Sequence, residues 1–156
     1  MIVAEQKPFE EIKSLISAAN KVLVLGCGTC VTVCFAGGEK EVSILASQLR
    51  MATRLEGQEK EIREFTVQRQ CEYEYNELAA DYIADADVIV SLACGIGVQT
   101  LNEQFPTKLT VPGVNTNGLS QPTEQGVWAE RCQACGDCVL ALTGGLIALA
   151  RWAGRT

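Results

Sequence analysis

Two short and almost entirely apolar runs, KVLVL at 21–25 and DVIVSL at 87–92, constrain the fold more than any other feature of the sequence. Runs of this length that are rich in Val and Ile are typical of strands buried on both faces. Apolar residues recur at helical spacing around them, at 8–19, 38–54 and 72–83. Because strands alternate with helices, the sequence predicts an α/β fold with a mostly parallel sheet flanked by helices.

Weaker patterns complete the predicted α/β domain. They indicate strands at 61–67 and 108–111 and a short helix at 97–103. We place this domain at residues 1–114. Residues 115–125 are rich in Asn, Thr, Gly, Gln and Pro, which predicts a loop that leads out of the sheet. The second unit, 115–156, then consists of this loop and a cysteine-rich, cluster-binding C-terminal segment.

The composition argues against two kinds of partner. The chain has 156 residues, and its 47% hydrophobic and 21% charged content are those of a globular protein. Its formal net charge is −6 and no cluster of Lys or Arg stands out, so the basic surface of a nucleic-acid binder is missing. Residues 1–20 carry charges where a secretory signal would be apolar, and the longest apolar tract, 139–150, is too short to cross a bilayer. We expect a folded cytoplasmic protein that binds neither nucleic acid nor a membrane.

Eight cysteines and no histidine indicate a metal site built from thiolates. Disulfides are uncommon in the cytosol, so thiols there stay reduced or bind metal. Without histidine, an iron or zinc site must rely on cysteine sulfur, and the commonest general acid–base side chain is also unavailable. No residue of this chain is assigned a catalytic role.

Four of the cysteines follow predicted strands. Ligands of parallel α/β sheets bind outside the carboxyl ends of the strands, and the loops at that edge would bring these thiols together. The predicted metal ligands here are Cys27, Cys30, Cys71 and Cys94. Glycines beside them, whose amides can approach a charged group closely, are predicted to bind the cofactor: Gly26, Gly28 and Gly95. Cys34 fits a core residue as well as a ligand.

The remaining cysteines form a C-x2-C-x2-C run at Cys132, Cys135 and Cys138. This spacing is that of consecutive ligands of bacterial ferredoxin-type clusters, and it predicts three ligands of a [4Fe-4S] cluster. Eight thiols suit one or two such clusters. The fourth ligand of the C-terminal site would come from the N-terminal cysteines, from another residue or from water. Zinc is the alternative metal, because tetrahedral zinc sites also use C-x2-C pairs.

Two other motifs are incomplete or leave most cysteines unexplained. The first strand runs into Gly26-Cys27-Gly28, but the third glycine of a dinucleotide-binding fingerprint is replaced by Val31. Cys27 and Cys30 also form a C-x-x-C pair like that of thioredoxin-like oxidoreductases. A dithiol oxidoreductase remains an alternative, although it leaves six thiols without a role.

Several longer segments point to one family: GCGTCVTVCFAGGEKEV, RQCEYE, SLACGIGVQ and EQGVWAERCQACGDCVLALTGG. With these segments, residues 1–145 resemble the small MetV-type subunit of methylenetetrahydrofolate reductases of acetogens and related anaerobes, also called the methylenetetrahydrofolate reductase C-terminal domain family. Where the family pattern has two further cysteines, this sequence has Ile147 and Trp152. The departure removes the obvious fourth ligand of the C-terminal site.

The resemblance implies a function in one-carbon metabolism, in the Wood-Ljungdahl pathway. It implies an iron-sulfur subunit, with zinc also considered, that takes electrons from an electron-donor protein and relays them to the flavin of a larger methylenetetrahydrofolate reductase subunit. The chain itself would be a non-catalytic accessory subunit of that oxidoreductase complex. A structural zinc-binding subunit that positions or stabilises the flavoprotein is the alternative.

Overall fold

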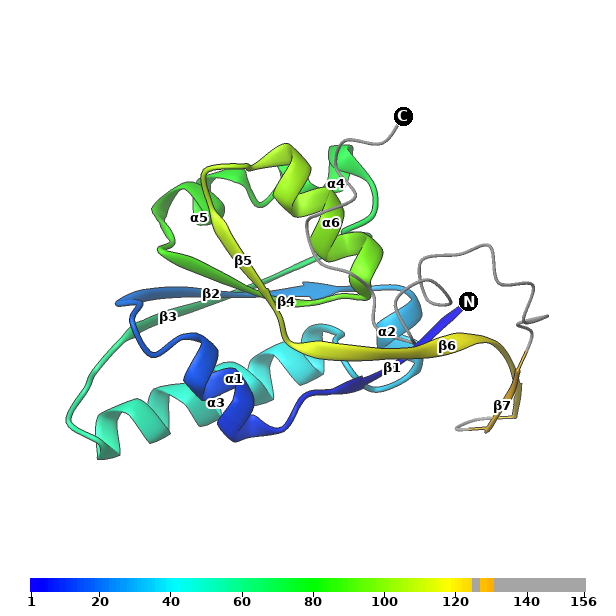
Figure 1. The fold of residues 1–156 in the computed structure, drawn as a ribbon, viewed down its shortest axis with the longest axis horizontal. Helices are drawn as coiled ribbons and strands as arrows, with labels where there is room; N and C mark the ends of the chain where they lie inside the picture. The colour runs from blue at the N-terminus through cyan, green and yellow to red at the C-terminus, as the bar shows by residue number, and fades with distance from the viewer. Residues whose placement is uncertain (125–126, 131–156) are drawn as a thin grey trace.

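The computed structural model describes residues 1–124 and 127–130. Its centre is a four-stranded parallel sheet with the strand order β3-β2-β4-β5 (Figure 1). The strands are β2 (Lys21–Cys27), β3 (Glu61–Val67), β4 (Val88–Leu92) and β5 (Leu109–Pro112). The predicted α/β fold with a parallel sheet is confirmed.

The two apolar runs form the middle of this sheet. Strand β2 pairs with β3 on one side and β4 on the other, and every residue of β4 is buried. Successive side chains of a strand point to opposite faces. In β2, Val22 and Val24 belong to one hydrophobic core, whereas Leu23 and Leu25 belong to another. A strand whose side chains pack into a hydrophobic core on each face has no polar face. This explains the continuous apolar pattern of β2.

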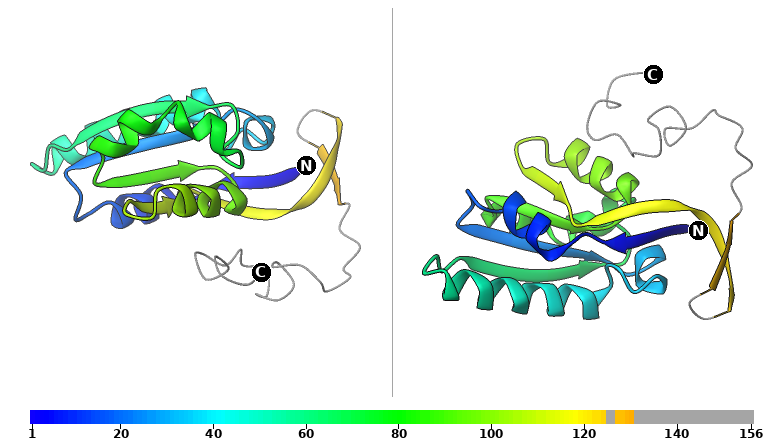
Figure 2. Two further views of the ribbon diagram at one scale, coloured as in Figure 1. Left: turned by 90° about the horizontal axis from the view of Figure 1, so that it is seen from above. Right: turned by 60° about the horizontal axis from the view of Figure 1, so that its bottom comes forward.

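Helices cover both faces of the sheet (Figures 1 and 2). Helices α1 (Phe9–Leu15) and α3 (Glu39–Leu55) lie on one face, and α4 (Tyr73–Glu77), α5 (Ala80–Asp85) and α6 (Gly95–Gln104) lie on the other. The single helix predicted at 72–83 is wrong, because the chain turns at Leu78 and Ala79. Of the two helices that result, α5 contacts β2 and α4 contacts α6.

Strands at the two ends of the described chain form a second, antiparallel sheet with the order β1-β6-β7. They are β1 (Ile2–Gln6), β6 (Val114–Glu124) and β7 (Val127–Glu130). The loop predicted at 115–125 is therefore wrong over 115–124. Pairing with β1 and β7 supplies the hydrogen bonds that make this polar segment a strand. The division of the chain at residue 114 stays a prediction.

One more short helix, α2 (Cys30–Val33), lies between β2 and α3 and contacts β1. It brings the loop after β2 next to the second sheet (Figure 1). Among residues 1–124 and 127–130, no helix has the length and apolar character needed to span a membrane.

Candidate metal centre

The four N-terminal cysteines predicted as ligands all lie at the carboxyl edge of the parallel sheet. Cys27 is the last residue of β2 and Cys30 is the first residue of α2. Cys71 lies in the loop between β3 and α4, and Cys94 directly precedes α6. Because the strands are parallel, their loops meet at one end of the sheet, as predicted. We call these residues the edge thiols.

The edge thiols range from buried to exposed. Cys27 is 7% exposed, and its Sγ lies 3.6 Å from Thr29 Oγ1 and 4.0 Å from the carbonyl oxygen of Gln68. Cys30 and Cys94 are half-buried, whereas Cys71 is exposed. A group bound at this edge would therefore have one side against the protein core and another, at Cys71, toward solvent.

The edge thiols influence one another electrostatically. Burial raises the pKa of the Cys94 thiol, and thiolates at Cys27 and Cys30 raise it further. The amides of Gly97 and Ile96 act in the opposite direction, because they favour the thiolate. Burial likewise raises the pKa of Cys71, with Cys27 as the next cause. Mutual repulsion of this kind is removed when a cation binds several thiolates at once.

The edge thiols do not form a finished ligand set. Within the described ranges, no group of three or more Cys, Asp or Glu side chains is arranged so that it could hold a metal ion. The donor chemistry fits iron or zinc, since both accept several thiolates. A metal bound by all four edge thiols would require their side chains to come closer together.

A buried polar network fixes the base of the loop that carries Cys71. Gln70 is fully buried and donates from its side-chain amide to the carbonyl oxygen of Leu25 at 2.8 Å. The Ser91 hydroxyl donates to Gln70 Oε1 at 2.7 Å, and the Asn76 side chain donates to the backbone oxygen of Gln70 at 3.0 Å. The residue before Cys71 is thereby bonded to β2, to β4 and to α4.

Sequence reasoning missed Gln70 and its partners. The available signal was Ser91, the single polar residue within the apolar run of β4. A hydroxyl buried in such a strand needs a hydrogen-bond partner, but the sequence does not reveal which residue supplies it. Gln70 itself stands among polar neighbours that give it no distinguishing pattern.

The glycines predicted to bind the cofactor have different surroundings. A Cβ at Gly26 would come within 2.5 Å of Val42 and 2.6 Å of Thr66, so packing against α3 already accounts for this residue. A Cβ at Gly28 would meet its nearest atoms at 3.5 Å, an ordinary contact. The Gly95 amide donates to Thr116 Oγ1 at 3.3 Å, which joins the start of α6 to β6. Their predicted role in cofactor binding stays a prediction.

A cavity of about 460 Å³ opens beside Gly28 and Gln68, between the start of α3 and the end of β3. In the described part of the chain, its charged lining residues are Glu39 and Glu64. Two carboxylates would repel the phosphates of a dinucleotide. The cavity therefore agrees with the incomplete glycine fingerprint in disfavouring a nucleotide.

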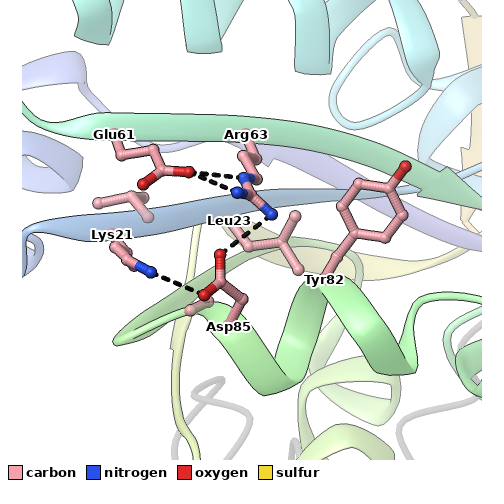
Figure 3. A pocket seen from close by; sticks show the side chains of 8 residues that line it. Lys21, Leu23, Glu61, Arg63, Tyr82 and Asp85 are labelled. Atoms are coloured by element: carbon pink, nitrogen blue, oxygen red, sulfur yellow. Dashed lines mark hydrogen bonds and ion pairs between the residues drawn. The ribbon is translucent and has the colours of Figure 1, made fainter.

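A second, much smaller pocket lies at the opposite end of the sheet, where β2 and β3 begin (Figure 3). It contains a chain of ion pairs. Lys21 binds Asp85 at 2.7 Å, and Arg63 binds Asp85 at 3.0 Å and Glu61 at 2.6 Å. Each of these charges is paired with another, so the ion pairs join β2, β3 and α5 at this end of the sheet.

The Cys34 side chain is directed toward β1. Its Sγ donates to the carbonyl oxygen of Ile2 in β1 at 3.6 Å, and its side chain packs against the core beneath α3. The three cysteines of the predicted C-terminal site, Cys132, Cys135 and Cys138, lie outside the described residues.

The fold and the edge thiols define a cysteine-rich α/β protein with four thiols at the carboxyl edge of its parallel sheet. In a comparison with protein families, residues 111–154 match the family described as methylene-tetrahydrofolate reductase C terminal. The chain is thereby associated with that family over these residues, which include the C-x2-C-x2-C run. No curated protein matches the chain, and no solved structure matches it.

Proposed function

We propose that this chain is an iron-sulfur electron-transfer subunit that relays electrons to a flavin-containing methylenetetrahydrofolate reductase subunit. The observation that carries the proposal is the delivery of the edge thiols from three successive strand ends to one edge of the sheet. The family match over 111–154 supports the choice of partner. The chain contributes no folate chemistry of its own.

The donor set favours an iron-sulfur cluster. Thiolates are the ligands of such clusters, and the sequence offers sulfur donors without any imidazole. When bound, an iron-sulfur cluster supplies one-electron transfer. An electron relay also needs its cluster to lie close to the protein surface. The edge meets this requirement, because Cys71 is exposed while Cys27 is buried.

The start of α6 supplies favourable electrostatics. The amides of Gly97 and Ile96 favour negative charge on Cys94, and the 10-residue helix directs the positive end of its dipole toward the same place. A cluster with four thiolate ligands carries a net negative charge. The helix therefore stabilises the charge that the cluster would bring.

A structural zinc ion is the second candidate. Four thiolates suit tetrahedral zinc, and one edge of the sheet provides four cysteines. Zinc there would join the loops after β2, β3 and β4 and would stabilise the fold without redox chemistry. The two candidates differ in metal content and in spectrum, so one preparation distinguishes them.

The test is anaerobic purification of the full chain, followed by iron, sulfide and zinc analysis and electron paramagnetic resonance after dithionite reduction. Iron and sulfide in equal amounts, at four or about eight atoms per chain, with a reduced-cluster signal, support the proposal. Zinc alone, with no iron after cluster reconstitution, overturns it in favour of the zinc subunit.

A matched pair of variants locates the site. Cys71→Ser removes an exposed edge thiol, whereas Ser43→Ala changes a residue that lines the neighbouring acidic cavity. We expect the first to lose metal and the second to retain it. Relay is then tested by mixing the reduced chain with the oxidised flavoprotein: flavin bleaching must be faster than with the metal-free chain.

A further inference from the structure

Strand β3 is an edge of the parallel sheet. In the described part of the chain it pairs with β2 on one side and with no strand on the other. An unpaired strand edge offers a row of N–H and C=O groups to which another extended chain can bond. Natural proteins usually cover such edges with charged side chains, bulges or helices. What covers β3 therefore indicates whether the edge is closed or available for binding.

Hydrogen bonds at both ends of β3 fix which backbone groups face the open edge. The Glu61 amide donates to the carbonyl oxygen of Asn20 at 2.8 Å, and the Gly28 amide donates to the carbonyl oxygen of Val67 at 2.9 Å. In a parallel pair, alternate residues of a strand bond to the same neighbour. Every second residue from Glu61 to Val67 is thus bonded to β2. The intervening residues direct their backbone groups toward the open edge; they are Ile62, Glu64 and Thr66.

Arg50 of α3 covers the first part of this edge. Its Nε donates to the carbonyl oxygen of Ile62 at 3.1 Å, and its guanidinium lies 3.7 Å from the Glu64 carboxylate. Beyond this point, the outward backbone groups of Glu64 and Thr66 make no hydrogen bond within residues 1–124 and 127–130. The edge is therefore closed at Ile62 and open from Glu64 onward.

The open stretch coincides with the acidic cavity beside Gly28. The consecutive residues 64–68 line this cavity, together with Glu39, Val42 and Ser43 at the start of α3. Its volume of about 460 Å³ lies within the range of roughly 300–1,000 Å³ that is typical of ligand pockets. If an extended segment bonded to the β3 edge, alternate side chains of that segment would point toward α3 and enter the cavity.

The charge of the cavity selects a basic side chain. Glu39 has no ion-pair partner within the described ranges, and the guanidinium of Arg50 lies beyond hydrogen-bond distance from Glu64. Both carboxylates can therefore accept hydrogen bonds from a Lys or Arg side chain. A second copy of this chain fits poorly, because pairing two β3 edges would bring four such carboxylates together.

The cavity also adjoins the edge thiols. Gly28 directly follows Cys27, and the carbonyl oxygen of Gln68 lies 4.0 Å from Cys27 Sγ. Gly28 and Gln68 both line the cavity. A segment held there would lie beside the thiols from which the relay would send its electrons.

We propose that an extended segment of the flavoprotein subunit adds to β3 as a further strand at 64–68 and inserts a Lys or Arg side chain between Glu39 and Glu64. This inference rests on the proposed function for the identity of the partner, but it does not require a bound metal. The backbone of the added strand pairs with the outward N–H and C=O groups of Glu64 and Thr66.

Amide hydrogen exchange tests the strand addition, with the full chain measured alone and in complex with the purified flavoprotein. The amides of Glu64 and Thr66 should exchange at least about tenfold more slowly in the complex, because they gain hydrogen bonds. The amides of Phe65 and Val67, which β2 already bonds, are the internal reference. A stable complex in which Glu64 and Thr66 exchange as fast as in the free chain overturns the inference.

A proline variant tests the same contact by affinity. Thr66→Pro removes one outward amide and leaves the pairing with β2 intact, since proline is tolerated on strand edges. The dissociation constant for the flavoprotein should rise at least about fivefold. Thr66→Val keeps the amide and should bind as the wild type does. Wild-type affinity in a folded proline variant contradicts the inference, and the exchange measurement decides if this variant does not fold.

Charge variants test the basic side chain. Glu39→Gln and Glu64→Gln should each weaken binding about threefold at low salt, and the difference should shrink as salt is added. Asp81→Asn is the matched control, because it removes an exposed charge on α5 and should leave the affinity unchanged. Equal affinity of all three variants overturns the insertion of a basic side chain.

The outcomes separate this inference from the proposed electron transfer. A wild-type chain that binds zinc alone overturns the relay, whereas slowed exchange at Glu64 and Thr66 in its complex still supports strand addition. Electron transfer within a complex that leaves these amides unprotected supports the relay and overturns the inference. A chain that does not bind the flavoprotein overturns both.

Discussion

The Ser91 hydroxyl donates to Gln70 Oε1 at 2.7 Å, so the buried middle of β4 is bonded to the residue that precedes Cys71. Both side chains are fully buried. Neither partner can exchange this hydrogen bond for one to water without opening the core. The position of the exposed loop that carries Cys71 thus depends on a buried contact between Gln70 and β4.

Ser91→Ala should lower the free energy of unfolding by about 1–3 kcal/mol, because it leaves Gln70 Oε1 buried without its donor. Urea unfolding of the metal-free chain measures this loss. The alkylation rate of Cys71 should rise in the same variant, since its loop loses an anchor. Equal alkylation rates in variant and wild type would contradict the positioning role.

Thr110→Val provides the matched control. The Thr110 hydroxyl is buried in β5 and has no hydrogen-bond partner within the described part of the chain. Replacing it with a methyl group removes an unsatisfied polar atom at constant shape. The free energy of unfolding should stay constant or increase, in contrast to the loss at Ser91.

Gly37→Ala should cost at least about 2 kcal/mol in the free energy of unfolding, or prevent folding. A Cβ at Gly37 would lie 2.0 Å from the carbonyl oxygen of Leu92, a backbone atom of the central sheet that cannot move aside. Gly28→Ala is the control, since its Cβ would meet its nearest atoms at 3.5 Å. Urea unfolding compares the two.

Gly28→Ala also tests the predicted role of Gly28 in cofactor binding. If a cluster approaches this backbone closely, the variant should keep the stability of the metal-free chain and bind less iron. Iron content after reconstitution is the measurement. Full iron content would show that Gly28 is dispensable for the cofactor.

At position 35 a glycine variant should be more stable than an alanine variant, which is the reverse of the usual order. Phe35→Gly should be more stable than Phe35→Ala by about 0.5–1 kcal/mol, because an L-residue with φ of 57° is strained and glycine is not. The exposed ring contributes little burial in either comparison. Thermal unfolding of the two variants measures this difference in stability. Alanine equal to or better than glycine would mean that the turn at Phe35 relaxes in solution.

Asp87 should make stability depend on acid pH. Its carboxylate accepts hydrogen bonds from the amides of Lys21 at 2.8 Å and Asn20 at 3.0 Å, and these bonds lower its pKa in the folded state. A lowered pKa stabilises the fold above the unfolded value, about 3.9, and this contribution disappears as the pH falls through the folded pKa. The difference in unfolding free energy between wild type and Asp87→Asn should therefore be constant at neutral pH and should shrink below about pH 4. If the difference in unfolding free energy persists at lower pH, the stabilisation by Asp87 does not come from the charge of its carboxylate.

The parallel sheet could be predicted because its signal is local. Strands β2 and β4 are buried on both faces, so each appears as a continuous apolar run whatever its neighbours are. Helix α3 has a long apolar stripe, and its observed bounds differ from the predicted ones by one residue at each end. The positions of Cys27 and Cys94 followed directly, since each comes at or just after a strand end.

The antiparallel sheet could not be predicted because its partners are far apart in the sequence. Strand β1 buries only one of its five residues, so it carries no clear strand pattern. Strand β6 has the composition of a loop, and it is a strand because β1 and β7 accept and donate its hydrogen bonds. The orientation of Cys34 toward Ile2 depends on the same pairing and was equally inaccessible to sequence reasoning.

The pairing of β1 with β6 also sets an order of assembly. The loops that carry the edge thiols belong to residues 27–94, so that edge can form while β6 is still unpaired. Met1 meets Ser120 only after a loop of more than a hundred residues has closed, and closing so long a loop is entropically costly and slow. During synthesis on the ribosome, the edge thiols are therefore the first to be gathered, whereas the surroundings of Cys34 are completed only when the last strands arrive.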